Sequence, residues 1–393
     1  MTMRLGLVAG EPSGDLIASS VVRGLQSHFS DVQVQGIGGP SLEAAGMQLW
    51  HPMNALSVFG YVDALKSLPR LLHIYGDVSQ RWLNNPPDIF MGVDAPDFNL
   101  RLEDKLHKKG IPTVHFVSPS IWAWRYERIH QIRRAVSHML VLFPFEKAIY
   151  EKEGIPVSYV GHPMADAIEL NPDRLAARTA LGVESDAPTV ALMPGSRSSE
   201  IRLMAPRFLE AAQKLQARQP DMVFLVPMVN AVRHQEFMQH LAARPVPGLR
   251  VLTAGDTASE RPLSWQVLAA CDMAMVTSGT ATLEAALFKR PMVISYVLSP
   301  WMRRIMAWKS GQDRPSLPWV GLPNVLAQTF VVPELLQDEA QPEMLVDSFW
   351  QLWSDLDRRK AIEAQFASIH ETLRCGTAQR VTQALVDVLG SRS

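Results

Sequence analysis

The stretch LMPGSRSSEI, residues 192–201, joins an apolar run to what looks like the first turn of a helix. A helix start leaves backbone N–H groups without partners inside the helix, and an arginine beside them adds positive charge. We therefore interpret Gly195, Ser196 and Arg197 as a phosphate-binding loop. Nucleotide-binding domains usually carry such a loop directly after their first strand. Its position near the middle of the chain predicts that a second domain begins just before it.

Length, charge and cysteine content narrow the class of protein. With 393 residues, the chain is long enough for two α/β domains of roughly 150–200 residues each. Lys plus Arg (38) nearly cancels Asp plus Glu (39), which argues against a nucleic-acid-binding protein. Cys271 and Cys375 stand far apart, outside any metal-binding or disulfide pattern. We expect a cytosolic chain without a signal peptide or membrane span, leaving contact with a membrane surface open.

The pattern of the chain predicts two similar halves. Short apolar runs that alternate with longer periodic segments are typical of a parallel sheet wrapped by helices. Strands are predicted at 4–9, 32–37, 89–93, 113–117, 138–142 and 158–160, then at 189–193, 222–226, 250–253, 273–277 and 292–296. Helices are predicted at 15–29, 99–109 and 144–153. We expect domains at 1–168 and 169–355, with helices at 356–393 that pack back on the first domain.

Two acidic residues follow strands of the first half. In VAGEPSGD, residues 8–15, the glycines permit a tight turn, and Ser13 or Asp15 can cap the helix. Glu11 in this turn is suited to contact sugar hydroxyls or an acceptor, although an ordinary turn also explains the stretch. In GVDAPDFN, residues 92–99, Asp94 stands where a general base would lie, and Asp97 is better explained as a helix cap.

Aromatic residues and a histidine follow later strands of the first half. In VSPSIWAWR, residues 117–125, Trp122 suits a sugar or acyl-chain surface, although tryptophans in such loops usually pack. His162 in Gly161-His-Pro163 is either a polar contact or a satisfied structural histidine.

The second half repeats the strand-to-helix turn in MVTSGTATLE, residues 275–284. Ser278, Gly279 and Thr280 begin the helix, and two helix starts that point into one crevice suit a diphosphate. Glu284 can accept both hydroxyls of a ribose or, alternatively, complete a capping box.

Two apolar segments admit two interpretations. Residues 56–75 place Val58, Leu65 and Leu72 at helical spacing, and residues 301–309 mix bulky apolar with basic residues. Both are ordinary core-facing helices unless the substrate is a lipid, in which case contact with a membrane surface or acyl chain becomes attractive.

Seven segments, taken together, resemble the lipid-A-disaccharide synthase family. They read VAGEPSGD, GVDAPDFN, VSPSIWAWR, FPFEKAIYEKEGIPVSYVGHPMAD, LMPGSR, VTSGTATLEAAL and VGLPNVLA, and the similarity runs in order along essentially the whole chain. The resemblance implies a glycosyltransferase of the B type, with two Rossmann-like, doubly wound α/β domains facing each other across a cleft. It implies a hexosyltransferase of lipid A biosynthesis, in the lipopolysaccharide pathway of Gram-negative bacteria. UDP-2,3-diacylglucosamine would be joined to 2,3-diacylglucosamine 1-phosphate (lipid X), with inversion and without a metal or other cofactor, giving the β-1',6-linked disaccharide 1-phosphate and UDP.

The resemblance also assigns residues and a location. It makes Asp94 the base, and Glu11 a residue that positions the acceptor or acts with the base. It gives the UDP-sugar to Gly195, Ser196, Arg197, Ser278, Gly279, Thr280, Glu284 and Asn324, the last of which is otherwise explained by a turn. Acceptor or lipid contacts are expected from Ser13, Trp122, Val58, Leu65 and Leu72. The protein is expected on the cytoplasmic face of the inner membrane, as a peripheral protein; the sequence leaves its oligomeric state open.

Two alternatives remain at this point. One is a UDP-sugar enzyme with a soluble substrate, similar to UDP-N-acetylglucosamine epimerases. The other is a nucleotide-sugar sensor without catalytic activity. Turnover with an acyl-bearing acceptor distinguishes a disaccharide synthase from both alternatives.

Overall fold

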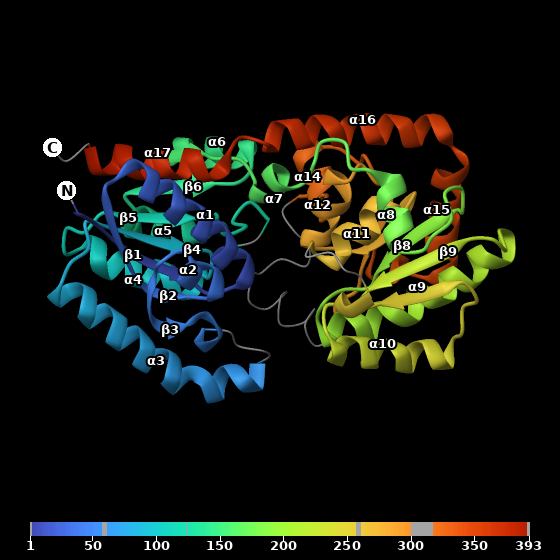
Figure 1. Ribbon diagram of the computed structural model, residues 1–393, viewed down its shortest axis with the longest axis horizontal. Helices are drawn as coiled ribbons and strands as arrows, with labels where there is room; N and C mark the ends of the chain where they lie inside the picture. Colours follow the sequence, from blue (N-terminus) through green and yellow to red (C-terminus); the bar gives the residue numbers. More distant parts are fainter. Residues whose placement is uncertain (1, 57–60, 124, 257–260, 300–316, 391–393) are drawn as a thin grey trace. The chain divides into compact units, whose positions relative to one another are not determined.

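The computed structural model describes residues 2–56, 61–123, 125–256, 261–299 and 317–390, with the backbone alone over 61–67. The chain divides into two compact units, one made of Met1–Asp166 with Leu373–Ser393 and the other of Ala167–Thr372. Each unit holds one parallel sheet with helices around it, which is the expected α/β fold (Figure 1).

The first unit contains a parallel sheet in the order β3-β2-β1-β4-β5-β6-β7. Its strands are β1 (Thr2–Ala9), β2 (Asp31–Gly38), β3 (Gln48–Pro52), β4 (Ile89–Val93), β5 (Thr113–Phe116), β6 (His138–Val141) and β7 (Val157–Tyr159). Its helices are α1 (Pro12–His28), α2 (Pro40–Ala44), α3 (Tyr61–Asn84), α4 (Pro96–His107), α5 (Ile129–Ala135), α6 (Pro144–Lys152) and α17 (Thr377–Gly390), with α7 (Pro163–Ala167) at the boundary. Residues 5–9 of β1 and the whole of β4 are apolar and buried because helices cover both faces of the sheet.

The second unit contains a parallel sheet in the order β10-β9-β8-β11-β12-β13. Its strands are β8 (Thr189–Met193), β9 (Val223–Pro227), β10 (Leu249–Leu252), β11 (Met273–Thr277), β12 (Met292–Tyr296) and β13 (Glu334–Leu336). Its helices are α8 (Arg174–Ala180), α9 (Ser198–Arg218), α10 (Ala231–Ala243), α11 (Leu263–Ala270), α12 (Thr280–Leu287), α14 (Leu322–Ala327), α15 (Pro342–Ser354) and α16 (Leu356–Leu373). Short 3-10 helices occupy Met53–Ala55, Tyr126–Arg128, Ala254–Asp256 and Gln337–Glu339 of the chain.

Each sheet has one point at which the order of its strands reverses. In the first sheet the chain proceeds from β1 outward through β2 and β3, and then starts again on the other side with β4. In the second sheet the same reversal lies between β8 and β11. Open parallel sheets bind ligands beyond the carboxyl ends of the strands at this reversal. The topology alone therefore marks the loops after β1, β4, β8 and β11.

The last helices belong to different units. The helix α16 runs along the second unit, whereas α17, the red helix that ends the chain, packs against α1 of the first unit (Figure 1). At this contact a Cβ atom added to Gly24 would lie 2.5 Å from Oγ1 of Thr382. The glycine therefore lets the first and last helices of the chain approach closely.

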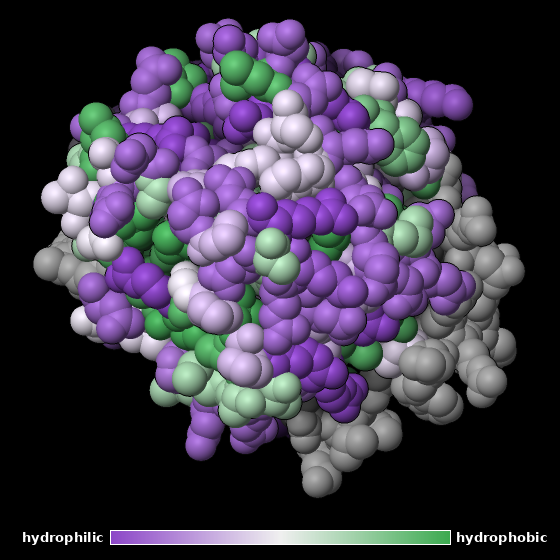
Figure 2. Space-filling model, turned by 90° about the vertical axis from the view of Figure 1, so that its right-hand side faces the viewer, coloured by the Kyte–Doolittle hydropathy of each residue, from purple (hydrophilic) through white to green (hydrophobic). Residues whose placement is uncertain are grey.

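In the view of Figure 2, hydrophilic residues cover most of the face, and hydrophobic ones gather at its lower left. Among the helices that the structure describes, none combines the length and apolar character needed to cross a bilayer. On α3, however, Leu68 and Leu72 are 49% and 59% exposed.

Candidate functional site

The loops after β1 and β4 are in contact. Glu11 is exposed and forms the N-cap of α1, with Ser13 exposed in the first turn of that helix. A Cβ atom added to Gly10 would lie 3.2 Å from Cβ of Ala95, which is the residue after Asp94. The fold thus brings the two acidic loops of the first half together at the strand reversal.

Asp15 does not cap α1 as expected. Its buried carboxylate accepts the N–H groups of Gly39 at 2.6 Å and Ser41 at 2.9 Å, at the start of α2. The expectation for Asp97 is also wrong, because Ala95 is the N-cap of α4 and the exposed Asp97 pairs with Arg128. Neither carboxylate caps the helix in which it lies.

Asp94 sits in a tightly held turn at the end of β4. Asp94 and Ala95 both adopt left-handed backbone angles, with φ of 52° and 43°. The N–H of Asp94 donates to the carbonyl of Phe116 at 2.9 Å, and the Asn99 side chain donates to the carbonyl of Asp94 at 2.7 Å. Non-glycine residues in this region carry strain that persists only where neighbours impose it, and such strain gathers at functional sites.

The environment of Asp94 suits a proton acceptor. Burial raises the pKa of the Asp94 carboxyl, while its charge interaction with His115 lowers that pKa. A carboxylate with a raised pKa accepts a proton near neutral pH more readily than an ordinary one.

Trp122, in the loop after β5, is held by contacts with residues of α6. Its indole N–H donates to Oε1 of Glu146 at 3.3 Å, and its ring meets Phe145 edge to face. Glu146 also accepts the N–H of Phe143 at 3.1 Å, and burial raises the pKa of Glu146 to about 7. Trp122 is only half-buried, so part of its ring remains available to a ligand.

His162 lies inside the first unit. It is 7% exposed, its Nδ1 accepts the N–H of Met164 at 3.2 Å, and burial lowers its pKa to about 4. This placement is that of a structural histidine rather than of a surface contact.

The loop after β8 differs from the expected open phosphate site. The carboxylate of Glu200 accepts the N–H groups of Ser196 at 3.0 Å and Arg197 at 3.2 Å. It also pairs with the Arg197 guanidinium at 2.9 Å. The expectation that these N–H groups are free is therefore wrong: Glu200 holds them as a capping box. The side chain of Arg197 is nevertheless 78% exposed, and Gly195 has a φ of 108°.

The loop after β11 is more open. Gly279 is the N-cap of α12 with a φ of 148°, and no heavy atom beyond its neighbours lies within 4 Å of a Cβ added there. Gly279 and Thr280 are exposed, and Ser278 is half-buried. A capping box with Glu284 is absent from this described helix; instead Glu284 bonds with Ser264 and Trp265 of α11. Burial raises the pKa of Glu284, and these two bonds lower it.

Asn324 has a fully occupied side chain. It is completely buried, and its Oδ1 accepts the N–H groups of Val331 at 2.8 Å and Val332 at 3.0 Å. Its Nδ2 donates to Val332 and to Glu334, which leads into β13. These contacts assign Asn324 a structural task inside the second unit, and its expected ligand contact stays a prediction.

The expected lipid contacts are only partly visible. Val58 and the segment 301–309 lie outside the described residues, as does the side chain of Leu65. The segment 56–75 does enter a helix, α3, on which Leu72 is exposed.

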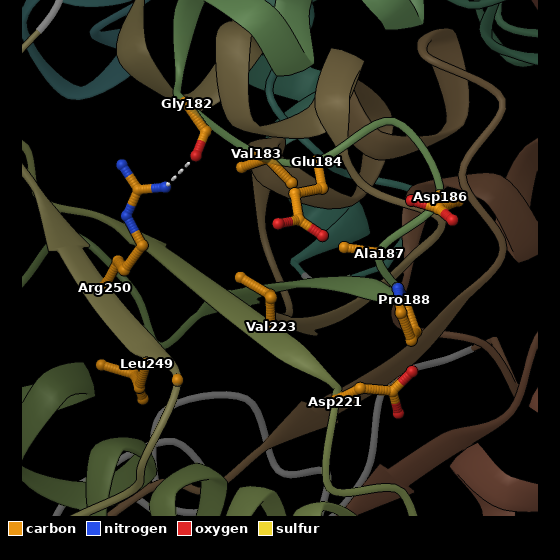
Figure 3. A pocket seen from close by; sticks show the side chains of 11 residues that line it. Gly182, Val183, Glu184, Asp186, Ala187, Pro188, Asp221, Val223, Leu249 and Arg250 are labelled. Carbon is orange, nitrogen blue, oxygen red and sulfur yellow. Dashed lines mark hydrogen bonds between the residues drawn. The ribbon is translucent and has the colours of Figure 1, made fainter.

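A cavity of about 640 Å³ opens at the amino-terminal ends of β8, β9 and β10. Figure 3 shows Glu184 among its lining residues and Arg250 donating to the carbonyl of Gly182. The four loops described above lie at the carboxyl ends of their strands. This cavity therefore lies at the opposite end of the strands of the second sheet from the loops after β8 and β11.

Sequence reasoning missed two polar residues, Glu103 and His115, and the role of the Glu200 carboxylate. Glu103 and His115 are completely buried beside the Asp94 turn. Their signal was a charged residue on the sheet-facing side of α4 and a histidine within the apolar run of β5.

Comparison with known proteins places the whole chain in one family. Residues 5–388 match the family described as lipid-A-disaccharide synthetase. A lipid-A-disaccharide synthase of Bordetella petrii is 64% identical over 389 residues, covering 99% of both chains. One from Aromatoleum aromaticum is 47% identical, covering 99% of this chain and 97% of its own.

Solved structures share the fold at much lower identity. The UDP-GlcNAc 2-epimerase of Neisseria meningitidis, bound to UDP-GlcNAc, has a TM-score of 0.66 at 13% identity and covers 98% of this chain and 100% of its own. MurG of Acinetobacter baumannii has a TM-score of 0.59 at 13% identity over 98% of this chain and 100% of its own. These similarities concern the arrangement of the backbone. The match over residues 5–388 and the full-length relatives show that the chain belongs to the lipid-A-disaccharide synthetase family, a family of glycosyltransferases.

Proposed function

We propose that the chain is an inverting hexosyltransferase that joins UDP-2,3-diacylglucosamine to 2,3-diacylglucosamine 1-phosphate. The products are the β-1',6-linked lipid A disaccharide 1-phosphate and UDP. The observation that carries this proposal is the placement of the motifs: the acidic loops follow β1 and β4, and the glycine loops follow β8 and β11. Each pair flanks the strand reversal of its own sheet, where such sheets bind ligands.

The first unit supplies the proton acceptor in this proposal. The 6-hydroxyl oxygen of the acceptor forms the new bond to the anomeric carbon of the donor, and the bond from that carbon to the diphosphate oxygen breaks. The hydroxyl proton passes to the Asp94 carboxylate, and UDP leaves. The raised pKa of Asp94 supports this role, and the contact between the loops of Asp94 and Glu11 supports a part for Glu11 in holding the acceptor.

The second unit supplies the donor site in this proposal. The exposed guanidinium of Arg197 and the helix start at Ser278, Gly279 and Thr280 are suited to the negative charge of the departing diphosphate. Because Glu200 already holds two N–H groups of the Gly195 loop, the diphosphate would contact this loop chiefly through Arg197 and the Ser196 hydroxyl.

Binding of acylated substrates accounts for the exposed leucines of α3. Leu68 and Leu72 lie one helical turn apart, so they share one face of the helix. We propose that this face contacts the membrane or the acyl chains, with the protein peripheral on the cytoplasmic face of the inner membrane.

The test is turnover with the two lipid substrates in mixed micelles, followed by detection of disaccharide and UDP. We expect both products. Folded protein that binds UDP without forming product would instead be a sensor. Conversion of UDP-N-acetylglucosamine to its epimer would identify the alternative enzyme, for which the structural similarity to epimerases provides a shared fold only.

Two substitutions test the assigned roles within the same assay. Asp94→Asn removes the proton acceptor and is expected to lower kcat by about 10²–10⁴-fold. Asp97→Asn, in the same turn but paired with Arg128, is the matched control and should retain the wild-type rate. Arg197→Ala should weaken UDP binding about tenfold or more, because a charge-assisted contact is lost. Arg202→Ala, exposed on the same helix α9, should leave UDP affinity unchanged.

A further inference from the structure

A buried pair of titratable side chains, a histidine and a glutamate, lies beside the Asp94 turn. Nδ1 of His115, on β5, lies 2.8 Å from Oε1 and 3.0 Å from Oε2 of Glu103, on α4. Both side chains are completely buried. Removing two such groups from water is costly, so a buried pair is weak evidence of a stabilising role. Its position relative to the proposed reaction is therefore informative.

The strand register fixes that position. His115 pairs with Gly92 across β4 and β5, and Gly92 precedes Asp94 by two residues, just before β4 ends. A Cβ atom added to Gly92 would lie 2.2 Å from Oε1 of Glu103 and 2.9 Å from Cβ of Asn99. The missing side chain of Gly92 thus provides the space that the buried pair occupies, directly before the turn.

Two polar atoms at this place have no partner among the described residues. They are Nε2 of His115 and Oδ1 of Asn99, both in completely buried residues. The other end of the Asn99 amide donates to the carbonyl of Asp94. A buried polar atom without a hydrogen bond costs free energy, and a fold that needed only packing here would place apolar side chains.

We infer that Glu103 and His115 are positioning residues that keep Asp94 in its carboxylate form until the acceptor hydroxyl delivers its proton. This inference rests on the proposed function, in which Asp94 is the proton acceptor. Glu103 holds the His115 ring through Nδ1, and positive charge on that ring favours a negative Asp94.

Charged groups approach the turn from three packed elements. Glu103 comes from α4, His115 from β5, and Glu11 from the loop after β1 that contacts Ala95. His115 is the charged side chain whose interaction lowers the pKa of Asp94, against the effect of burial. Loss of the His115 side chain should therefore let burial dominate the pKa of Asp94.

The experiment is the pH profile of kcat/KM for the wild type, His115→Gln and Glu103→Gln. Both variants keep a polar side chain of similar size but weaken or remove the positive charge. We expect the acidic limb of each profile to move to higher pH by about one unit or more, and the rate to approach the wild type at alkaline pH. His138→Gln is the matched control. This histidine, at the start of β6, pairs with Val114, so its side chain points to the opposite face of the sheet from His115, and it bonds to Ser158. Its profile should coincide with that of the wild type.

The outcomes separate this inference from the proposed function. A uniform loss of rate at every pH, with the limb unmoved, would show that the pair is only structural and would overturn the inference. If His115→Gln does not fold, Glu103→Gln provides the same test, because it removes the carboxylate that holds the His115 ring. Wild-type rate in Asp94→Asn would refute the assigned base, whatever the profiles of the other variants. In the Asp94→Asn background, which lacks the titrating carboxylate, His115→Gln should leave the pH profile unchanged.

Discussion

The stability of this fold depends on pH through single buried residues, and Glu146 is the clearest case. Burial raises its pKa from about 4.5 to about 7, so the native chain binds a proton more tightly than the unfolded chain between these values. Stability then falls as pH rises through this window. Glu146→Gln removes the titrating group, so the free energy of unfolding of the wild type, relative to the variant, should fall by on the order of 2–3 kcal/mol between pH 4.5 and 7.

The wild type must be compared with Glu146→Gln at each pH, because His162 changes the stability with pH in the opposite direction. Burial lowers its pKa to about 4, so the unfolded chain takes up the proton first and stability falls as the pH decreases. Urea unfolding followed by circular dichroism measures the difference. Glu151→Gln, exposed on the same helix α6, is the control and should follow the wild type. A Glu146→Gln curve parallel to the wild type would contradict the assignment.

At the scale of elements, one carboxylate holds the returning end of the chain. Asp166 accepts the N–H groups of Gly376 at 2.9 Å and Thr377 at 2.6 Å, which begin α17. Asp166→Ala removes this cap and should destabilise the first unit by about 1 kcal/mol. It should also speed amide hydrogen exchange along α17. Asp173→Ala removes the equivalent cap of α8, in the second unit, and should leave exchange in α17 unchanged. Equal exchange of α17 in both variants would refute the role of Asp166.

Elements also differ in how far the sequence predicts them. Ile89–Val93, Thr189–Met193, Met273–Thr277 and Met292–Tyr296 match their predicted bounds, because central strands are continuous apolar runs. The edge strands β3 and β13 were not predicted. Residues 48–52 mix polar residues with a proline, and β13 has only three residues.

The candidate site shows the same division. The positions of Asp94 and Gly279 after strands could be predicted, because a strand-to-helix turn has local signals. The occupation of the Gly195 loop by Glu200 and the burial of Asn324 could not, because both depend on where side chains meet in the folded unit. Local patterns locate a site, whereas packing decides which of its polar groups remain available.

For the whole molecule, the question is how a chain without a described membrane-spanning helix reaches acylated substrates. Leu68 and Leu72 are 49% and 59% exposed on one face of α3, and Arg70, between them in the sequence, is also exposed. Burying a leucine side chain contributes about 1.5–3 kcal/mol. The double variant Leu68→Gln/Leu72→Gln should therefore reduce sedimentation with anionic lipid vesicles about tenfold or more.

Activity should change only where a membrane is involved. The double variant should show a raised KM for vesicle-bound acceptor, while kcat/KM with a short-chain acceptor below its micellar concentration stays at the wild-type value. Leu175→Gln is the matched control, because Leu175 is 62% exposed on α8 in the second unit. Its loss should change neither sedimentation nor KM if attraction to lipid depends on the α3 face rather than on exposed leucine in general. Equal effects of the α3 and α8 substitutions would refute a specific lipid-facing surface on α3.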